Sequence, residues 1–94
     1  MQIVKDELFI ASLQNTLAYI AEDSISQAIH FDHELEDKID NLTYMPLKFR
    51  PSLFHKDENI RDLIYKGYVI PYLVDKDKAL IVILNIFKGI DYSR

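Results

Sequence analysis

Apolar residues in the first half of the chain recur every three or four positions, which is the spacing of an α-helix. Two such stripes predict two helices, one over about residues 7–21 and one from residue 24 to about residue 45. The stripe positions are Phe9, Leu13, Leu17 and Ile20 in the first helix and Ala28, Phe31, Leu35, Ile39 and Leu42 in the second. Because about two residues separate the helices, we expect them to lie antiparallel and side by side.

Polar residues and one proline mark the ends of these helices. Asp6 can cap the first helix, and Ser24 with Gln27 three positions later forms a capping box for the second. Pro46 should end the second helix, since the residue before a proline is disfavoured in the helical conformation. A polar loop is expected over residues 46–59.

The second half of the chain has the pattern of strands joined by tight turns. Together with a short strand at the N-terminus, the expected strands cover residues 1–4, 60–65, 68–74 and 79–87. Lys66-Gly67 suits a two-residue turn because Gly67 is free to take a positive φ. Residues 75–78 form the second turn. The last run is almost continuously apolar, which predicts a strand in the middle of a sheet with both faces covered.

Pro71 interrupts the second of these three strands. A proline inside a sheet deletes one ladder hydrogen bond, so we expect a bulge or a locally missing partner opposite it. The sheet should present Val82 or Ile83 to the helices. The sequence therefore predicts one α+β domain over residues 1–94, a short strand and an antiparallel helical hairpin packed on an antiparallel sheet.

Composition narrows the setting in which this domain works. The 94 residues fit one domain, and the absence of cysteine excludes disulfides and thiolate metal sites. No apolar run approaches the roughly 20 residues that a membrane span needs, and the N-terminus lacks the pattern of a signal peptide. We therefore expect a cytoplasmic protein that does not contact a membrane.

Charge is distributed unevenly along the chain. Residues 1–47 carry two basic and nine acidic side chains, giving −7, whereas residues 48–94 carry nine basic and six acidic ones, giving +3. An anionic partner should therefore meet the second half. The net charge of −4 makes general nucleic-acid binding unfavourable, because phosphate contacts dominate that affinity.

Several segments in this order resemble the RelE/ParE toxin superfamily of type II toxin–antitoxin systems. They are residues 18–24 (AYIAEDS), Met45-Pro46, residues 60–63 (IRDL), residues 66–75 (KGYVIPYLVD) and residues 88–91 (KGID). The likeness covers about residues 2–91 and is strongest to the ParE-like, or plasmid-stabilisation, branch. It implies a compact toxin held inactive by a cognate antitoxin, whose extended tail wraps the sheet and helices.

The resemblance implies two alternative cellular targets for a toxin of this superfamily. ParE proteins proper poison DNA gyrase, whereas RelE relatives cut mRNA on the ribosome. ParE-like chains often end the last strand with a histidine and, three residues later, an arginine, where this sequence has Lys88 and Asp91 (or Ile90, one place earlier). Ribosome-dependent nucleases carry dense Lys and Arg across the sheet, and these strands are sparse in both. This favours an inhibitor, or a toxin fold that has lost toxicity, over an mRNA endoribonuclease.

Candidate binding residues lie mainly in the basic half. Those predicted to contact the target or the antitoxin are Arg50, Arg61, Lys66, Tyr68, Lys88 and Tyr92. Under the nuclease alternative the cations would neutralise a phosphorane, and Tyr68, Tyr92 or His55 would serve as acid–base or stacking groups. No residue is assigned a catalytic role, because the sequence contains no self-contained catalytic motif.

A short histidine motif on the second helix is the one arrangement with metal-ligand spacing. His30, His33 and Glu34 stand at i, i+3 and i+4, but zinc needs three or four converging ligands and nothing nearby completes the set. We therefore predict no metal and no cofactor.

Overall fold

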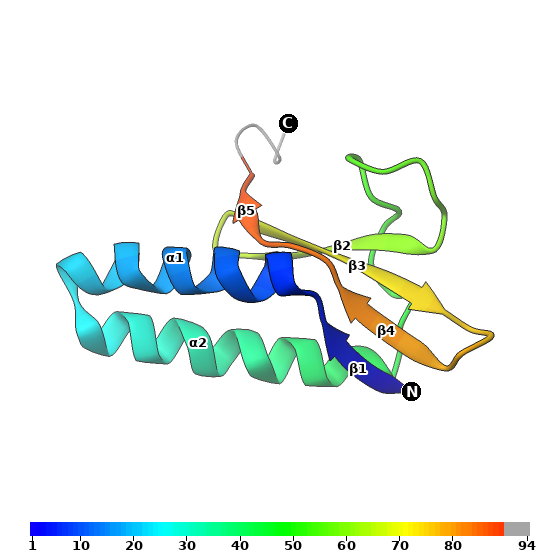
Figure 1. Ribbon diagram of the computed structural model, residues 1–94, viewed down its shortest axis with the longest axis horizontal. Helices are drawn as coiled ribbons and strands as arrows, with labels where there is room; N and C mark the ends of the chain where they lie inside the picture. The colour runs from blue at the N-terminus through cyan, green and yellow to red at the C-terminus, as the bar shows by residue number, and fades with distance from the viewer. Residues whose placement is uncertain (90–94) are drawn as a thin grey trace.

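The computed structural model describes residues 1–89, which form a helical hairpin packed on one face of a twisted sheet (Figure 1). The elements are β1 (Gln2–Lys5), α1 (Glu7–Asp23), α2 (Ile25–Asp40), a 3₁₀ turn (Asn41–Thr43), β2 (Ile60–Tyr65), β3 (Tyr68–Asp75), β4 (Leu80–Ile83) and β5 (Phe87–Lys88). The predicted α+β class and its order of elements are confirmed.

Both predicted helix caps are formed. The Asp6 carboxylate accepts a hydrogen bond from the amide of Leu8 at 3.0 Å. Ser24 is extended, with φ −158° and ψ 115°, and its hydroxyl accepts from the amide of Gln27 at 3.2 Å. This single non-helical residue is enough to reverse the chain, so α1 and α2 run antiparallel. The α-helical part of the second helix ends at Asp40, earlier than predicted, and one 3₁₀ turn follows it.

The sheet has the order β1-β4-β3-β2, with β5 pairing with β3. Strands β2, β3 and β4 form the predicted antiparallel meander. Strand β1, however, pairs in parallel with β4, from Gln2 opposite Leu80 to Lys5 opposite Ile83. The expectation of a wholly antiparallel sheet is wrong on this point: the sheet is mixed. Tight turns impose antiparallel pairing only on consecutive strands, and the helical hairpin separates β1 from its neighbour.

Pro71 divides the last predicted strand in two. Tyr72 pairs with Ile83, and Val69 pairs with Phe87. Between these two pairs β3 advances by three residues, whereas the segment from β4 to β5 advances by four. The extra residue is a bulge, and it lies beside the residue that has no N–H to donate. The carbonyl of Pro71 still accepts a hydrogen bond from the amide of Leu84 at 2.9 Å. The predicted interruption opposite Pro71 is confirmed.

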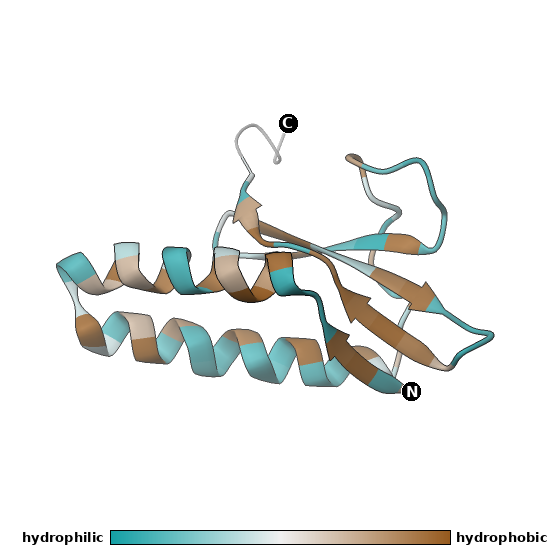
Figure 2. Ribbon diagram, in the orientation of Figure 1, coloured by the Kyte–Doolittle hydropathy of each residue, from teal (hydrophilic) through white to brown (hydrophobic). Residues whose placement is uncertain are grey.

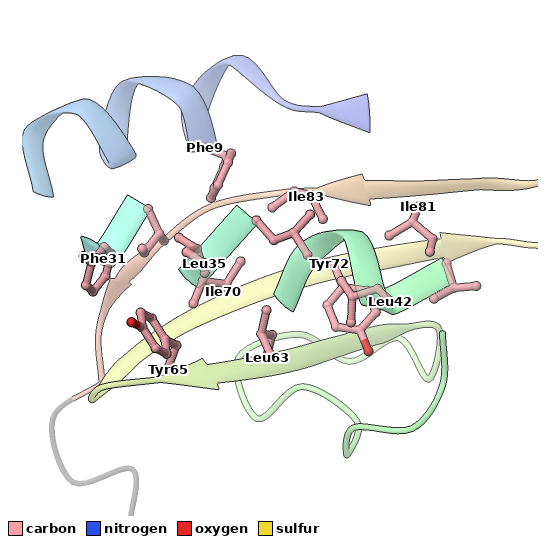
Figure 3. Close-up of a cluster of buried hydrophobic side chains, with 13 residues drawn as sticks. Phe9, Phe31, Leu35, Leu42, Leu63, Tyr65, Ile70, Tyr72, Ile81 and Ile83 are labelled. Carbon is pink, nitrogen blue, oxygen red and sulfur yellow. The ribbon is translucent and has the colours of Figure 1, made fainter. Parts of the chain in front are cut away.

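The core fills the space between the hairpin and the sheet (Figure 3). The buried members drawn there are Phe9, Phe31, Leu35, Leu42, Leu63, Tyr65, Ile70, Tyr72, Ile81 and Ile83, among others. Val82 and Ile83 were the two residues predicted to face the helices. Ile83 belongs to the core, whereas Val82 lies on the other face of the sheet and is half-buried. Figure 2 shows the same division, with hydrophobic residues concentrated along β3 and β4 and hydrophilic ones along much of α2.

The predicted turn between β2 and β3 is also formed. Lys66 has a φ of 49° and Gly67 a φ of 80°, the pair of positive values that a type I′ hairpin turn requires. Within residues 1–89, none of the helices is long and apolar enough to cross a membrane.

Candidate binding site

Three of the six predicted site residues lie together at one end of the sheet. The turn after β2 places Lys66 beside Tyr68, and the pairing of β3 with β5 places Lys88 opposite Tyr68. The ammonium group of Lys88 lies 5.1 Å from the centroid of the Tyr68 ring, within range of a cation–π contact. Phe31 of α2 packs edge-on against the same ring, with centroids 5.4 Å apart.

These residues line a hollow of about 250 Å³ between the sheet and the helical hairpin. Tyr19 of α1 and Gln27 and His30 of α2 complete its wall, at the point where the two helices meet. We name this hollow, with Lys66, Tyr68 and Lys88, the lysine pocket. It joins two cations to aromatic faces, an arrangement suited to a carboxylate or phosphate attached to an apolar or planar group.

The carboxylate of Glu34 on α2 contacts His30, which lines the pocket, and is held in place. The Tyr65 hydroxyl donates to Glu34 Oε1 at 2.6 Å, and His30 Nε2 lies 2.6 Å from Glu34 Oε2. The hydrogen bond from Tyr65, assisted by the nearby His30 and Lys66, lowers the pKa of Glu34. Burial, together with the Glu34 carboxylate, raises the pKa of Tyr65 to about 12. At neutral pH the pair is therefore an ionised carboxylate and a neutral phenol.

The histidine motif does not gather into a metal site. His30 and Glu34 contact each other across one helical turn, and His33 is exposed on α2. Within residues 1–89 no group of three or more metal-binding side chains converges.

Arg61 lies at the opposite end of β2 from the lysine pocket and contacts backbone instead. Its guanidinium donates to the carbonyls of Glu58 at 2.8 Å, Phe49 at 2.9 Å and Leu47 at 3.3 Å. All three carbonyls belong to the loop between α2 and β2. The structure therefore separates Arg61 from Lys66 and Lys88 and gives it a role in holding this loop.

Arg50 does not line the pocket. Arg50 is exposed in the same loop, and its carbonyl accepts a hydrogen bond from the amide of Asp62 at 3.3 Å. Tyr92 lies outside the described residues, as does Asp91.

Asp62 is a buried acid that sequence reasoning did not single out. It is 1% exposed, and its Oδ2 accepts from the amide of Leu53 at 3.2 Å. Its Oδ1 has no hydrogen-bond partner in the described part of the chain. The available signal was an aspartate inside the apolar strand IRDLIY. Its position, facing the loop rather than the helices, makes it a second anchor for the loop.

Tyr72 provides a third anchor. Its hydroxyl donates to the carbonyl of Pro46 at 2.7 Å, and burial raises its pKa to about 12. The loop over residues 46–59 is thus attached to β2 and β3 by an arginine, an aspartate and a tyrosine.

Comparison with known proteins identifies the family. A family model described as the ParE toxin of the type II toxin–antitoxin system parDE matches residues 3–90. The chain belongs to the ParE toxin family. A solved structure described as the chromosomal ParDE TA system from P. aeruginosa resembles this ParE-family chain with a TM-score of 0.75 and 18% identity. The match covers 94% of this chain and 95% of that one. Among curated proteins, none matches significantly.

Membership of the ParE family agrees with the resemblance drawn from residues 2–91. At 18% identity the solved structure supports the fold alone. The family supports a toxin of a type II system, for which a cognate antitoxin is the implied partner.

Proposed function

We propose that this ParE-family chain inhibits a cytoplasmic target by binding it, that the target is DNA gyrase, and that a cognate antitoxin neutralises it. The family match over residues 3–90 carries the proposal of a toxin. The lysine pocket supports recognition of an acidic partner, because Lys66 and Lys88 line a single hollow together with Tyr68.

Some of the ionisable groups that a nuclease could use are already engaged within the protein. An mRNA endoribonuclease needs converging cations and a group free to exchange a proton at the reacting phosphate. Glu34 accepts a hydrogen bond from Tyr65 and is paired with His30. Arg61 is bound to three loop carbonyls. These engagements remove Glu34 and Arg61 from a nuclease site and leave Tyr68, beside Lys66 and Lys88, as its acid–base candidate. The gyrase proposal is favoured over a RelE-type nuclease because the strands carry few Lys and Arg residues.

The antitoxin contact proposed from sequence changes accordingly. Acidic side chains were expected to meet Arg61 and Lys66, which lie at opposite ends of β2. We now place that contact at Lys66 and Lys88, which line the same pocket.

The test is to induce expression of the chain in cells and to measure DNA damage and mRNA cleavage in parallel. We expect a rise in double-strand breaks and the SOS response while mRNA stays intact. The variant K66E/K88E should reduce this response, whereas K56E/K78E, which makes the same charge change at exposed positions, should not. Site-specific mRNA cleavage on translating ribosomes, without DNA damage, would overturn the gyrase proposal and establish the RelE-type alternative.

A further inference from the structure

A hollow of about 320 Å³ lies between the two helices, on the face of the hairpin turned away from the lysine pocket. It is lined only by residues of α1 and α2, namely Leu17, Ala18, Ala21, Ala28, Ile29 and Asp32. The lysine pocket is lined by other residues of the same two helices, among them Tyr19 and Gln27. Successive residues of a helix lie about 100° apart around its axis, so the two hollows occupy opposite faces of the hairpin. We name this second hollow the hairpin groove.

The hairpin groove exposes large apolar side chains. Ile29 is 54% exposed, and Ile25, one helical turn earlier, is 69% exposed. In Figure 1 the joined ends of α1 and α2 extend beyond the sheet, so within the described chain the strands leave this end of the hairpin uncovered. Single apolar residues on a protein surface are ordinary, but two isoleucines beside a hollow mark an interaction surface.

The shape of the hairpin groove suits a helix. Leu17 and Ala21 of α1, and Ile25 and Ile29 of α2, each stand four positions apart and so form two short ridges with the hollow between them. A third helix packs into such a groove by placing its own side chains between the ridges. Both walls are helices whose backbone groups bond internally, so a strand has no edge to pair with here, whereas a helical partner satisfies its own backbone.

The hairpin carries charges of one sign over most of its length. Residues 7–37 contain no Lys or Arg. Their acidic residues are Glu7, Glu22, Asp23, Asp32, Glu34, Glu36 and Asp37. Glu34 and Glu36 are paired with His30 and Lys5, whereas no salt bridge within residues 1–89 involves the carboxylates beside the groove. An apolar hollow bordered by unpaired carboxylates favours a partner that is apolar and basic.

The end of α1 strengthens this preference for a basic partner. The helix ends in Glu22 and Asp23 and has no basic residue in its last turn. The C-terminus of a helix is the negative end of its dipole, so acidic residues there are unfavourable and a cation is favourable. A Lys or Arg side chain supplied by a partner at this end of the hairpin would offset both the carboxylates and the dipole.

We propose that the hairpin groove binds a basic amphipathic helix of the target, DNA gyrase, whose apolar side chains pack on Ile25 and Ile29. This inference rests on the proposed function, since it gives the proposed target a contact on the other face of the hairpin from the lysine pocket. The target is the suitable occupant because the antitoxin segment placed at Lys66 and Lys88 is acidic, and the carboxylates of the hairpin would repel it.

The experiment measures, by calorimetry, the affinity of the chain for purified gyrase and, separately, for the purified product of the adjacent reading frame as the antitoxin. I25Q/I29Q removes the exposed apolar side chains, and E22K/D23K reverses the charge at the end of α1. Each should weaken binding to gyrase by about tenfold or more and leave antitoxin affinity unchanged.

Each variant has a matched control away from the groove. L8Q/L53Q also replaces two exposed apolar side chains, and D40K/D77K also reverses two exposed acidic ones. Both controls should bind gyrase as the wild type does. All of the substituted positions are exposed, so unchanged circular dichroism will confirm folding. E22K/D23K should also raise the melting temperature, because it places cations at the C-terminus of α1, and a weaker complex formed by a more stable protein cannot be attributed to unfolding.

The remaining outcomes separate this inference from the proposed function. Wild-type affinity for gyrase in both groove variants would overturn the inference and leave gyrase as the target. Loss of antitoxin affinity in these variants would overturn the assignment of the groove to the target. A change in the sedimentation of the free chain caused by I25Q/I29Q would assign the groove to a second copy instead. Absence of gyrase binding by the wild-type chain would overturn the proposed target, and this inference with it.

Discussion

Replacing Arg61 by methionine should loosen the loop over residues 46–59 and destabilise the protein. The change keeps an apolar stem of similar length but removes three hydrogen bonds to the carbonyls of Leu47, Phe49 and Glu58. A hydrogen bond from a charged donor contributes about 1.5–3 kcal/mol. The three share one half-buried guanidinium, and freed carbonyls can bind water, so their contributions do not add fully. We expect the free energy of unfolding to fall by about 2–4 kcal/mol.

The assay combines denaturant unfolding with hydrogen exchange of the loop. The amide of Ser52, which donates to the carbonyl of Ile60 at 2.8 Å, should exchange faster in Arg61→Met. Lys56→Met removes a charge from an exposed position of the same loop and serves as the control. If Arg61→Met unfolds at the wild-type denaturant concentration and Ser52 stays protected, the structural role assigned to Arg61 is wrong. A binding role, as first expected from sequence, would then be the better account of this residue.

Three further predictions concern the core and its ionisable groups. Leu35→Ala, at a position 1% exposed, should cost about 2–5 kcal/mol in denaturant melts, whereas Leu53→Ala, at 64%, should change stability by less than about 0.5 kcal/mol. The pKa of Tyr72 is about 12 in the folded protein, against about 10 in the unfolded chain. The contribution of Tyr72 to stability is therefore complete below pH 10 and is lost as the pH rises toward 12. Tyr72→Phe should make the loss of stability at alkaline pH shallower and should cost about 0.5–1.5 kcal/mol at neutral pH. The lowered pKa of Glu34 has the opposite consequence: its contribution is present at neutral pH and is lost as pH falls through the carboxyl range, so Glu34→Gln should make the acid side of the stability profile flatter.

The sequence predicted most of the fold because local signals and tertiary packing agree. Asp6 and Ser24 cap the helices they were expected to cap, and the Lys66-Gly67 turn has the backbone that glycine permits. Even the interruption opposite Pro71 followed from one missing donor. What escaped prediction was the parallel pairing of β1 with β4, since no turn joins these strands and periodicity cannot specify the direction of a distant neighbour.

The site was less predictable, because sequence shows which residues carry charge but not what each charge meets. Lys66 and Lys88 lie 22 positions apart and come together only through the pairing of β5 with β3. Arg61 belonged to the same expected patch, yet three carbonyls of a loop without regular structure bind it. The buried position of Asp62 could not be predicted either, because it depends on how that loop folds over β2.

The central claim, that this chain is the toxin of a type II pair, is tested most directly by growth after induction. The chain should arrest growth when expressed alone, and co-expression of the adjacent reading frame should restore it while forming a complex that co-purifies with the chain. Normal growth in cells that accumulate the folded chain without its partner would contradict the account.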